Sequence, residues 1–180
     1  MNRPETGLTE ADRRRLESGE LLVSSETASD RARARAIGLV DAPPDVVWDV
    51  ITDYDGYREF MPMTVESRVE RVEGNSVDLF MELKVLIKRI RYRIRLFLDR
   101  PARTVDWERI DGDLKANEGS WRLAPYDNGG ASGRGRTLAT YTVRLEIGFF
   151  VPAAIADRLT KGSFPALYKA VRERAASVAR

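Results

Sequence analysis

The stretch KRIRYRIRLFL, Lys88–Leu98, alternates charged and apolar side chains almost residue by residue. Successive side chains of a β-strand point to opposite faces of the sheet, so this alternation predicts a strand. One face carries arginines, and the other face is apolar and should point toward the core of the protein. The apolar face consists of Ile90, Tyr92, Ile94, Leu96 and Leu98.

The same period of two recurs on both sides of this stretch. It predicts further strands at Arg31–Val40, Val65–Glu73, Val77–Val85, Thr104–Ile110, Gly119–Ala124 and Thr137–Ile147. Glycine, asparagine or proline residues lie in most of the links, and we interpret the glycine-rich segment Asn128–Gly135 as a hairpin loop. Strands joined by short links form an antiparallel meander. We therefore expect an antiparallel sheet of about seven strands.

Two helical regions flank the strands. The segment APPDVVWDVITDYDGYREFMP, Ala42–Pro62, starts with prolines that suit a first helical turn, and Gly56 divides it into two short helices. Toward the C-terminus, Pro152–Ala179 has an apolar stripe of helical period, and Gly162 and Pro165 predict a kink or break in it. Antiparallel strands with helices segregated from them define the α+β class. The C-terminal helix is the only large apolar element that can cover the sheet.

The composition limits the chemistry that the chain can perform. It contains neither cysteine nor histidine, which removes disulfides, thiolate metal sites and the usual general base near neutral pH. The 30 Lys and Arg residues nearly balance the 28 Asp and Glu residues, so the net charge is only +2. No metal-ligand cluster, nucleophile elbow or phosphate-binding loop occurs. We therefore expect no catalytic residue, no metal site and no cofactor, and the patterns favour a binding protein over an enzyme.

Residues 1–30 are polar and charged and are predicted to form an N-terminal extension, whereas residues 31–180 form one domain. The first 20 residues lack the apolar core of a secretory signal. No stretch is long and apolar enough to span a membrane. We expect a cytoplasmic protein, with contact at the membrane periphery as one option.

The order of strand, two short helices, six strands and long helix resembles the START-like (SRPBCC) helix-grip superfamily. The matching stretches are VDAPPDVVWDVITDYDGYREFMP, then GSWRLAPYDNGG and GRTLATYTVRLE, and finally FPALYKAVRERA. The resemblance is closest to the branch that holds polyketide cyclase-like and coenzyme Q-binding proteins. It implies a curved sheet wrapped round the C-terminal helix, with a deep apolar cavity between them. Members of the superfamily carry lipids, cyclise polyketides or bind macromolecules.

Such a cavity would be lined by the inner faces of the predicted strands. The candidate ligand-binding residues are aromatic, polar or flexible side chains on those faces and on the C-terminal helix: Met81, Tyr92, Trp107, Arg109, Trp121, Tyr141, Phe164 and Tyr168. A buried Arg109 would need a partner, which could be Glu118 or a ligand carboxylate, or it could reach solvent at the strand end. The alternative to a cavity is an ordinary filled core in which the polar tips bond locally.

The arginine face of Lys88–Leu98 has two interpretations. A row of arginines could bind nucleic acid. However, the neighbouring strands place Asp78 and Glu82 on one side of it, and Asp106 and Glu108 on the other. Opposite charges on adjacent strands form a cross-strand ladder. We favour the ladder and do not expect nucleic acid as a partner.

Two apolar loops should lie at one end of the sheet, because alternate strands of a meander leave it at the same end. Leu86 and Ile87 occupy one link, and Phe149 and Phe150 follow the last strand. These residues could surround the cavity mouth, where exposed apolar side chains would contact a membrane and nearby lysines would suit anionic headgroups. Alternatively, they close the bottom of the core.

The patterns together favour binding or transport of a hydrophobic small molecule, such as a lipid, an isoprenoid quinone or a polyketide-like compound, between the sheet and the C-terminal helix. Two alternatives stay open. One is a polyketide cyclase or dehydratase in which Tyr92, Tyr141 and Arg109 orient and polarise the substrate. The other is a ribosome- or protein-binding module that uses the basic outer face.

Overall fold

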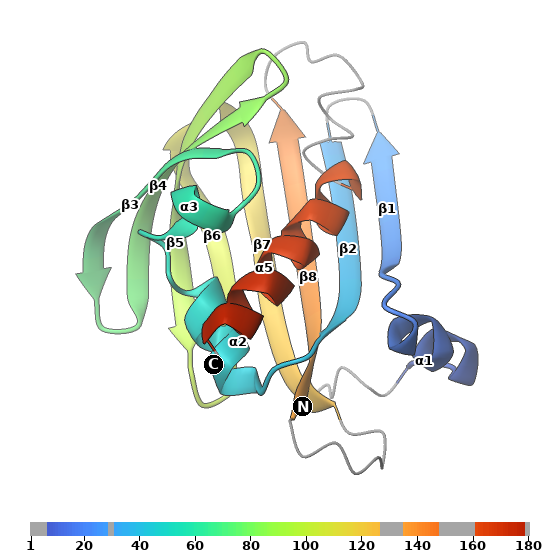
Figure 1. The fold of residues 1–180 in the computed structure, drawn as a ribbon. Coiled ribbons are helices and arrows are strands. Elements are labelled where there is room, and N and C mark those ends of the chain that lie inside the picture. Colours follow the sequence, from blue (N-terminus) through green and yellow to red (C-terminus); the bar gives the residue numbers. More distant parts are fainter. Residues whose placement is uncertain (1–6, 29–30, 127–134, 148–160, 179–180) are drawn as a thin grey trace.

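The structure is a computed structural model that describes residues 7–28, 31–126, 135–147 and 161–178. Within them, eight antiparallel strands form one sheet in the order β1-β2-β8-β7-β6-β5-β4-β3 (Figure 1). The strands are β1 Leu22–Ala28, β2 Arg31–Val40, β3 Thr64–Glu73, β4 Ser76–Val85, β5 Lys88–Asp99, β6 Thr104–Gly112, β7 Leu114–Tyr126 and β8 Arg136–Ile147. The helices are α1 Glu10–Glu17, α2 Pro44–Ile51, α3 Tyr57–Phe60, the 3-10 turn η1 Lys161–Ser163 and α5 Phe164–Val178. This confirms the predicted α+β class.

The sheet has one strand more than the sequence predicted, because β1 belongs to it. This strand pairs antiparallel with β2 along its whole length, from Leu22 opposite Ile37 to Ala28 opposite Arg31. The helix before it begins with a capping box, in which Thr9 and Asp12 bond each other's backbone N–H groups. Part of the segment predicted as an extension therefore forms an edge of the sheet.

The predicted pair of short helices after β2 is confirmed. Pro44 opens α2, where its missing N–H is not needed. The entry to α2 is tied to β8, since Thr137 Oγ1 donates to the Ala42 carbonyl at 2.7 Å. The corner that follows is tied to β3 by a hydrogen bond from Ser67 Oγ to the Tyr54 carbonyl, 2.5 Å long. These bonds hold the α2–α3 corner, which we define as residues 52–63, in front of the sheet.

The C-terminal helix lies diagonally across the same face of the sheet (Figure 1). Near the predicted break, the 3-10 turn η1 ends at Ser163, and Pro165 lies in the first turn of α5. The predicted helical residues 152–160 lie outside the described residues. The buried stripe of α5 is Phe164, Tyr168, Val171 and Ala175. The Tyr168 hydroxyl reaches the carbonyls of Ala36 on β2 and Ala139 on β8, at 3.0 and 2.8 Å.

A glycine allows this close helix–sheet contact. A Cβ atom on Gly38 would lie 2.7 Å from the ring of Tyr168. No real Cβ contact is that short, so the ring can rest on β2 only because the side chain is absent. Through Tyr168, the helix therefore packs closely against β2 and β8.

The outer face of the sheet carries the β4 side of the predicted charge ladder, whereas Asp106 on β6 bonds Arg122 on β7 instead of an arginine of β5. Glu82 on β4 accepts hydrogen bonds from both Arg89 and Arg91 on β5. Farther along β5, Arg95 bonds Asp78 through two nitrogens, at 2.7 and 2.8 Å. Arg93 reaches across β4 to Glu70 on β3, at 2.8 Å. The four arginines of β5 thus have acidic partners within the protein.

Candidate ligand-binding cavity

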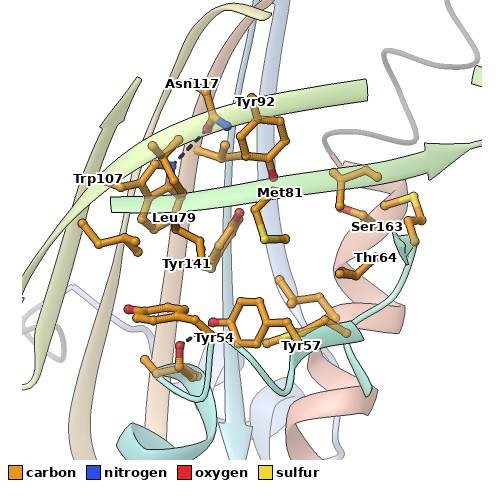
Figure 2. Close-up of a pocket in the computed structure, with 18 of the residues that line it drawn as sticks. Tyr54, Tyr57, Thr64, Leu79, Met81, Tyr92, Trp107, Asn117, Tyr141 and Ser163 are labelled. Carbon is orange, nitrogen blue, oxygen red and sulfur yellow. Dashed lines mark hydrogen bonds between the residues drawn. The ribbon is translucent and has the colours of Figure 1, made fainter. Parts of the chain in front are cut away.

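An apolar cavity of about 160 Å³ lies between the inner face of the sheet and the α2–α3 corner. Strands β4 to β8 form its wall, Tyr54, Tyr57 and Met63 close it from the corner, and Ser163 and Leu167 border it from the C-terminal helix. Figure 2 shows Asn117, Trp107 and Tyr92 at one end of the cavity, with Tyr54 and Tyr57 at the other. The sheet and the α2–α3 corner thus enclose the cavity, and the start of the C-terminal helix borders it.

Five of the eight predicted ligand-binding residues line this cavity. They come from five different strands and share the inner face of the sheet: Met81, Tyr92, Trp107, Trp121 and Tyr141. The alternation of period two predicted their inner-face position, because the pairing of their strands is regular at these residues.

Phe164 and Tyr168 are fully buried but stand beside the cavity. The Phe164 ring packs edge-on against Tyr141, with centroids 5.7 Å apart. The Tyr168 ring lies 5.9 Å from Trp121, and its hydroxyl is taken by backbone carbonyls. Both residues support cavity-lining rings from behind.

Arg109 does not line the cavity, although the sequence placed it on the inner face. A register shift between Arg93 and Ile94 disturbs the pairing of β5 with β6 next to Arg109. Its guanidinium group turns to the backbone carbonyls of Gly112 and Leu114 and so braces the turn between β6 and β7. Glu118, its suggested partner, bonds Arg144 at 2.9 Å instead.

The predicted mouth residues divide into two groups. Leu86 and Ile87 form the tip of the β4–β5 hairpin and are 53% and 94% exposed. Leu86 has φ +57°, which belongs to a tight turn. Leu83, three residues before the tip, lines the cavity. Phe149 and Phe150 lie outside the described residues.

One polar residue of the wall, Asn117 on β7, was not predicted from the sequence. The predicted strand began at Gly119, but β7 begins at Leu114. Extending the alternation of Trp121 and Gly119 backward by one step would have placed Asn117 on the inner face. The corner residues Tyr54 and Tyr57 were missed as well, because no strand pattern extends to them.

The polar atoms of the cavity are few and differ in how they are bonded. The Trp107 indole donates from Nε1 to Asn117 Oδ1 at 3.1 Å. The Tyr57 hydroxyl donates to the Ile51 carbonyl at the end of α2. The Tyr54 hydroxyl is buried and has no hydrogen-bond partner among the described residues. An unpaired buried hydroxyl costs free energy, so a polar group that reaches it would stabilise the protein.

Burial controls the ionisation of these phenols. Desolvation raises the pKa of Tyr54, Tyr92 and Tyr141 above the ordinary value of 10.0, because a phenolate would lose its hydration there. A hydrogen bond from Asn117 lowers the pKa of Tyr92 part of the way back. All three phenols are therefore neutral hydrogen-bonding groups at neutral pH and cannot act as bases.

Three aromatic rings build one side of the cavity. The Tyr141 ring stands 4.8 Å from Trp121 and 5.5 Å from Trp107, measured between centroids. Trp107 can lie against β7 because residue 119 is glycine: a Cβ there would be 2.2 Å from the indole. The resulting wall presents ring faces and edges, which suits a flat ligand.

The arrangement can bind an apolar molecule and hydrogen-bond its polar group. The residues that line the cavity within the described chain include no acidic or basic side chain. In the same part of the chain, no group of three or more acidic residues is placed to hold a metal ion. None of the described helices is long and apolar enough to cross a membrane.

Fold and cavity together define a class: an α+β helix-grip protein whose sheet and C-terminal helix enclose an apolar site. The family model for polyketide cyclase / dehydrase and lipid transport matches residues 40–172. The chain therefore belongs to that family, which confirms the predicted likeness to polyketide cyclase-like proteins. The predicted START-like helix-grip fold is confirmed by solved structures that share it. No curated protein matches it in sequence.

Solved structures with the same fold are distant in sequence. The Zhui aromatase/cyclase from Streptomyces sp. R1128 is 18% identical, with a TM-score of 0.70 over 89% of this chain and 97% of that one. A STAR-related lipid transfer protein from Xanthomonas axonopodis is 17% identical, with a TM-score of 0.70 over 86% and 93%. A START superfamily protein from Mycobacterium smegmatis is 14% identical, with a TM-score of 0.66 over 88% and 98%. At these identities the similarity establishes the fold.

Proposed function

We propose that this protein binds or transports a hydrophobic small molecule, such as a lipid, an isoprenoid quinone or a polyketide-like compound, in the cavity. The observation that carries the proposal is the cavity itself: about 160 Å³ of space whose described lining is uncharged and rich in aromatic and aliphatic side chains. Most ligand sites combine such walls with a few placed polar groups. Membership in a family of cyclases and lipid transporters supports the same conclusion.

Desolvation of the ligand would supply most of the affinity. Burying apolar surface is worth about 25 cal/mol per Å², so a two-ring compound that buries about 250 Å² gains about 6 kcal/mol before the entropic cost of association. Taken alone, that free energy would correspond to a dissociation constant of about 40 μM, and the entropic cost of association makes the binding weaker than this. Larger ligands would need the α2–α3 corner or the start of α5 to move.

Native mass spectrometry of the protein purified from its own host tests the proposal. We expect a population whose mass exceeds that of the chain by one small molecule, which organic extraction releases for identification. The control is Ile94→Phe, which fills the cavity and should lose the adduct. An adduct that survives in the filled variant would place the molecule elsewhere and contradict the proposal.

A second candidate function, a cyclase or dehydratase, rests on the two phenols that face the cavity, Tyr92 and Tyr141. Hydrogen bonds from them would polarise a ketone and stabilise an enolate. Against it, the described lining has no group that ionises near neutral pH. Mass spectrometry of a linear polyketone thioester incubated with the protein distinguishes the two. A carrier returns it unchanged, whereas a cyclising dehydratase removes water.

We also propose that the protein contacts membranes transiently to load its ligand. The exposed tip residues Leu86 and Ile87 lie next to the cavity-lining segment of β4, and Lys84 and Lys88 flank them. Apolar side chains between basic ones suit insertion among anionic headgroups. Such contact is compatible with the predicted cytoplasmic location, which stays a prediction.

Flotation with vesicles that contain anionic lipid tests this contact. The variant Ile87→Asp should float less than the natural protein, without loss of stability, since the Ile87 side chain is almost fully exposed. Val72→Asp on β3, another exposed apolar position, is the matched control. Equal flotation of all three proteins would refute membrane docking through this hairpin.

A further inference from the structure

The wall of the cavity opposite the α2–α3 corner contains a directed set of hydrogen-bond donors. An indole N–H can only donate, so Trp107 fixes the oxygen of the Asn117 amide on its own side, at 3.1 Å. The NH2 group of Asn117 is thereby turned away from Trp107. Asn117 is only 5% exposed, so its NH2 group also needs a partner inside the protein.

The Asn117 side chain also influences the ionisation of Tyr92. A hydrogen bond from the Asn117 side chain favours negative charge on the phenol oxygen, which is why it lowers the pKa of Tyr92 against the larger effect of burial. Figure 2 shows the Tyr92 hydroxyl facing the cavity.

Tyr141 adds a second hydroxyl beside the first. Its ring rises from β8, and its hydroxyl points to the same part of the cavity as that of Tyr92 (Figure 2). The two groups are close enough that Tyr92 contributes to the raised pKa of Tyr141. Both phenols stay protonated around neutral pH, so both can donate to one acceptor.

The lining of the cavity restricts which ligands can supply that acceptor. A charged group in the cavity would lack a counter-charge, since no acidic or basic side chain occurs in the described lining. The adjoining wall consists of the rings of Trp107, Trp121 and Tyr141. A cavity of about 160 Å³ suits one or two rings; an engineered apolar cavity of about 150 Å³ in another protein holds benzene.

We propose that the cavity recognises a neutral, ring-bearing ligand through one ketone or quinone oxygen, which accepts hydrogen bonds from Tyr92 and Tyr141. A carbonyl oxygen has two lone pairs, which match two donors. Asn117, oriented by Trp107, adds a further polar group to the same lining. This inference rests on the proposed function and narrows it, because ring ketones bind in preference to hydrocarbons of the same size.

Calorimetric titration with 1-tetralone and tetralin tests the preference, since these probes differ by one carbonyl group. The natural protein should bind 1-tetralone about tenfold more tightly than tetralin, the effect of one or two net hydrogen bonds. Tyr92→Phe removes one oxygen atom and should reduce the preference to about threefold while tetralin binding stays the same. Asn117→Leu should reduce it in the same direction.

Infrared difference spectra of 1-tetralone labelled at its carbonyl group measure hydrogen bonding to that group, which a change in packing alone does not alter. The carbonyl stretch of the bound ketone should lie at lower wavenumber in the natural protein than in Tyr92→Phe. Equal affinity of the natural protein for 1-tetralone and tetralin, or identical carbonyl frequencies in both proteins, would overturn this inference and leave the proposed function intact. Failure of both probes to bind the natural protein would overturn both.

Discussion

On the outer face of β5, Arg91 and Arg93 bond Glu82 and Glu70 at 2.6 and 2.8 Å, so their charges are matched within the sheet. On the inner face, between these two arginines, the Tyr92 hydroxyl faces a cavity. The Tyr54 hydroxyl across the cavity has no partner among the described residues. Polar groups on the outer face of the sheet therefore bond one another, whereas some polar groups on the cavity side are available to bond a ligand.

This contrast indicates that the charged outer face stabilises the fold, whereas the inner face carries the candidate site. The charged row is the more conspicuous feature of the sequence, but an arginine already bonded to a carboxylate has little left to offer a partner. The inner face has far fewer polar atoms, and each is desolvated, so each counts more in binding. The site is therefore found where polar groups are buried without full satisfaction.

The largest expected difference between the faces is in stability. Trp121 is buried against Tyr141 and Tyr168, whereas its neighbour Arg122 points outward to Asp106. Trp121→Ala should lower the free energy of unfolding by about 3–5 kcal/mol. Arg122→Ala should lower it by at most about 1 kcal/mol, as expected for a surface ion pair. Urea unfolding measures both; equal losses would mean that the two faces contribute alike.

A smaller effect is expected when the cavity is filled. Ile94 lines the cavity, so Ile94→Phe places extra volume in existing space and should change the free energy of unfolding by less than about 1.5 kcal/mol. Affinity for tetralin should fall at least tenfold. The matched enlargement Val171→Phe, at a fully buried position of α5, should cost about 1–3 kcal/mol because no space receives it.

Thermal melts and tetralin titrations of the two variants check this prediction. If Ile94→Phe is as destabilising as Val171→Phe and still binds tetralin, then the inner face of β5 is packed rather than hollow.

The smallest expected effects are those of pH on the free energy of unfolding. Groups on the inner face should lose their contribution at alkaline pH, and groups on the outer face should lose theirs at acid pH. Burial raises the pKa of Tyr92 and Tyr141 above that of the unfolded chain. Their contribution to stability is complete below about pH 10 and is lost as pH rises toward the raised values. Hydrogen bonding by Arg95 lowers the pKa of Asp78. Its contribution is complete above about pH 4 and is lost as pH falls through the lowered value.

Denaturant midpoints across the pH range test both limbs. Tyr92→Phe should flatten the alkaline loss and Arg95→Gln the acid loss, each leaving the other limb unchanged. A variant that altered both limbs would contradict the assignment of the groups to separate faces.

The strands could be predicted from the sequence because alternation is a local signal. The pattern of Lys88–Leu98 fixed both the strand and its inner face, and the same parity identified Met81, Trp107, Trp121 and Tyr141. The same parity gave the wrong position for Arg109, because the register shift in the pairing of β5 with β6 cannot be seen in the sequence of one strand. It also missed the role of β1, since short edge strands reveal no partner in their own sequence.

The cavity itself was not predictable from the residues in the same way. Its volume depends on how far the α2–α3 corner stands from the sheet, and on long-range bonds such as that from Ser67 to the Tyr54 carbonyl. Mainly the resemblance to helix-grip proteins led us to expect it. Asn117 shows the intermediate case: its position on the inner face followed from parity, but its partner Trp107 depends on the pairing of strands.

The temperature dependence of tetralin binding, measured by calorimetric titration, tests most directly whether the inner face encloses a ligand site. Tetralin has no hydrogen-bonding group, so any binding reflects the apolar cavity alone. We predict a single site with a negative heat-capacity change, the signature of buried apolar surface, and loss of that site in Ile94→Phe. Absence of binding, or binding with no heat-capacity change that persists in Ile94→Phe, would contradict the cavity as the site of function.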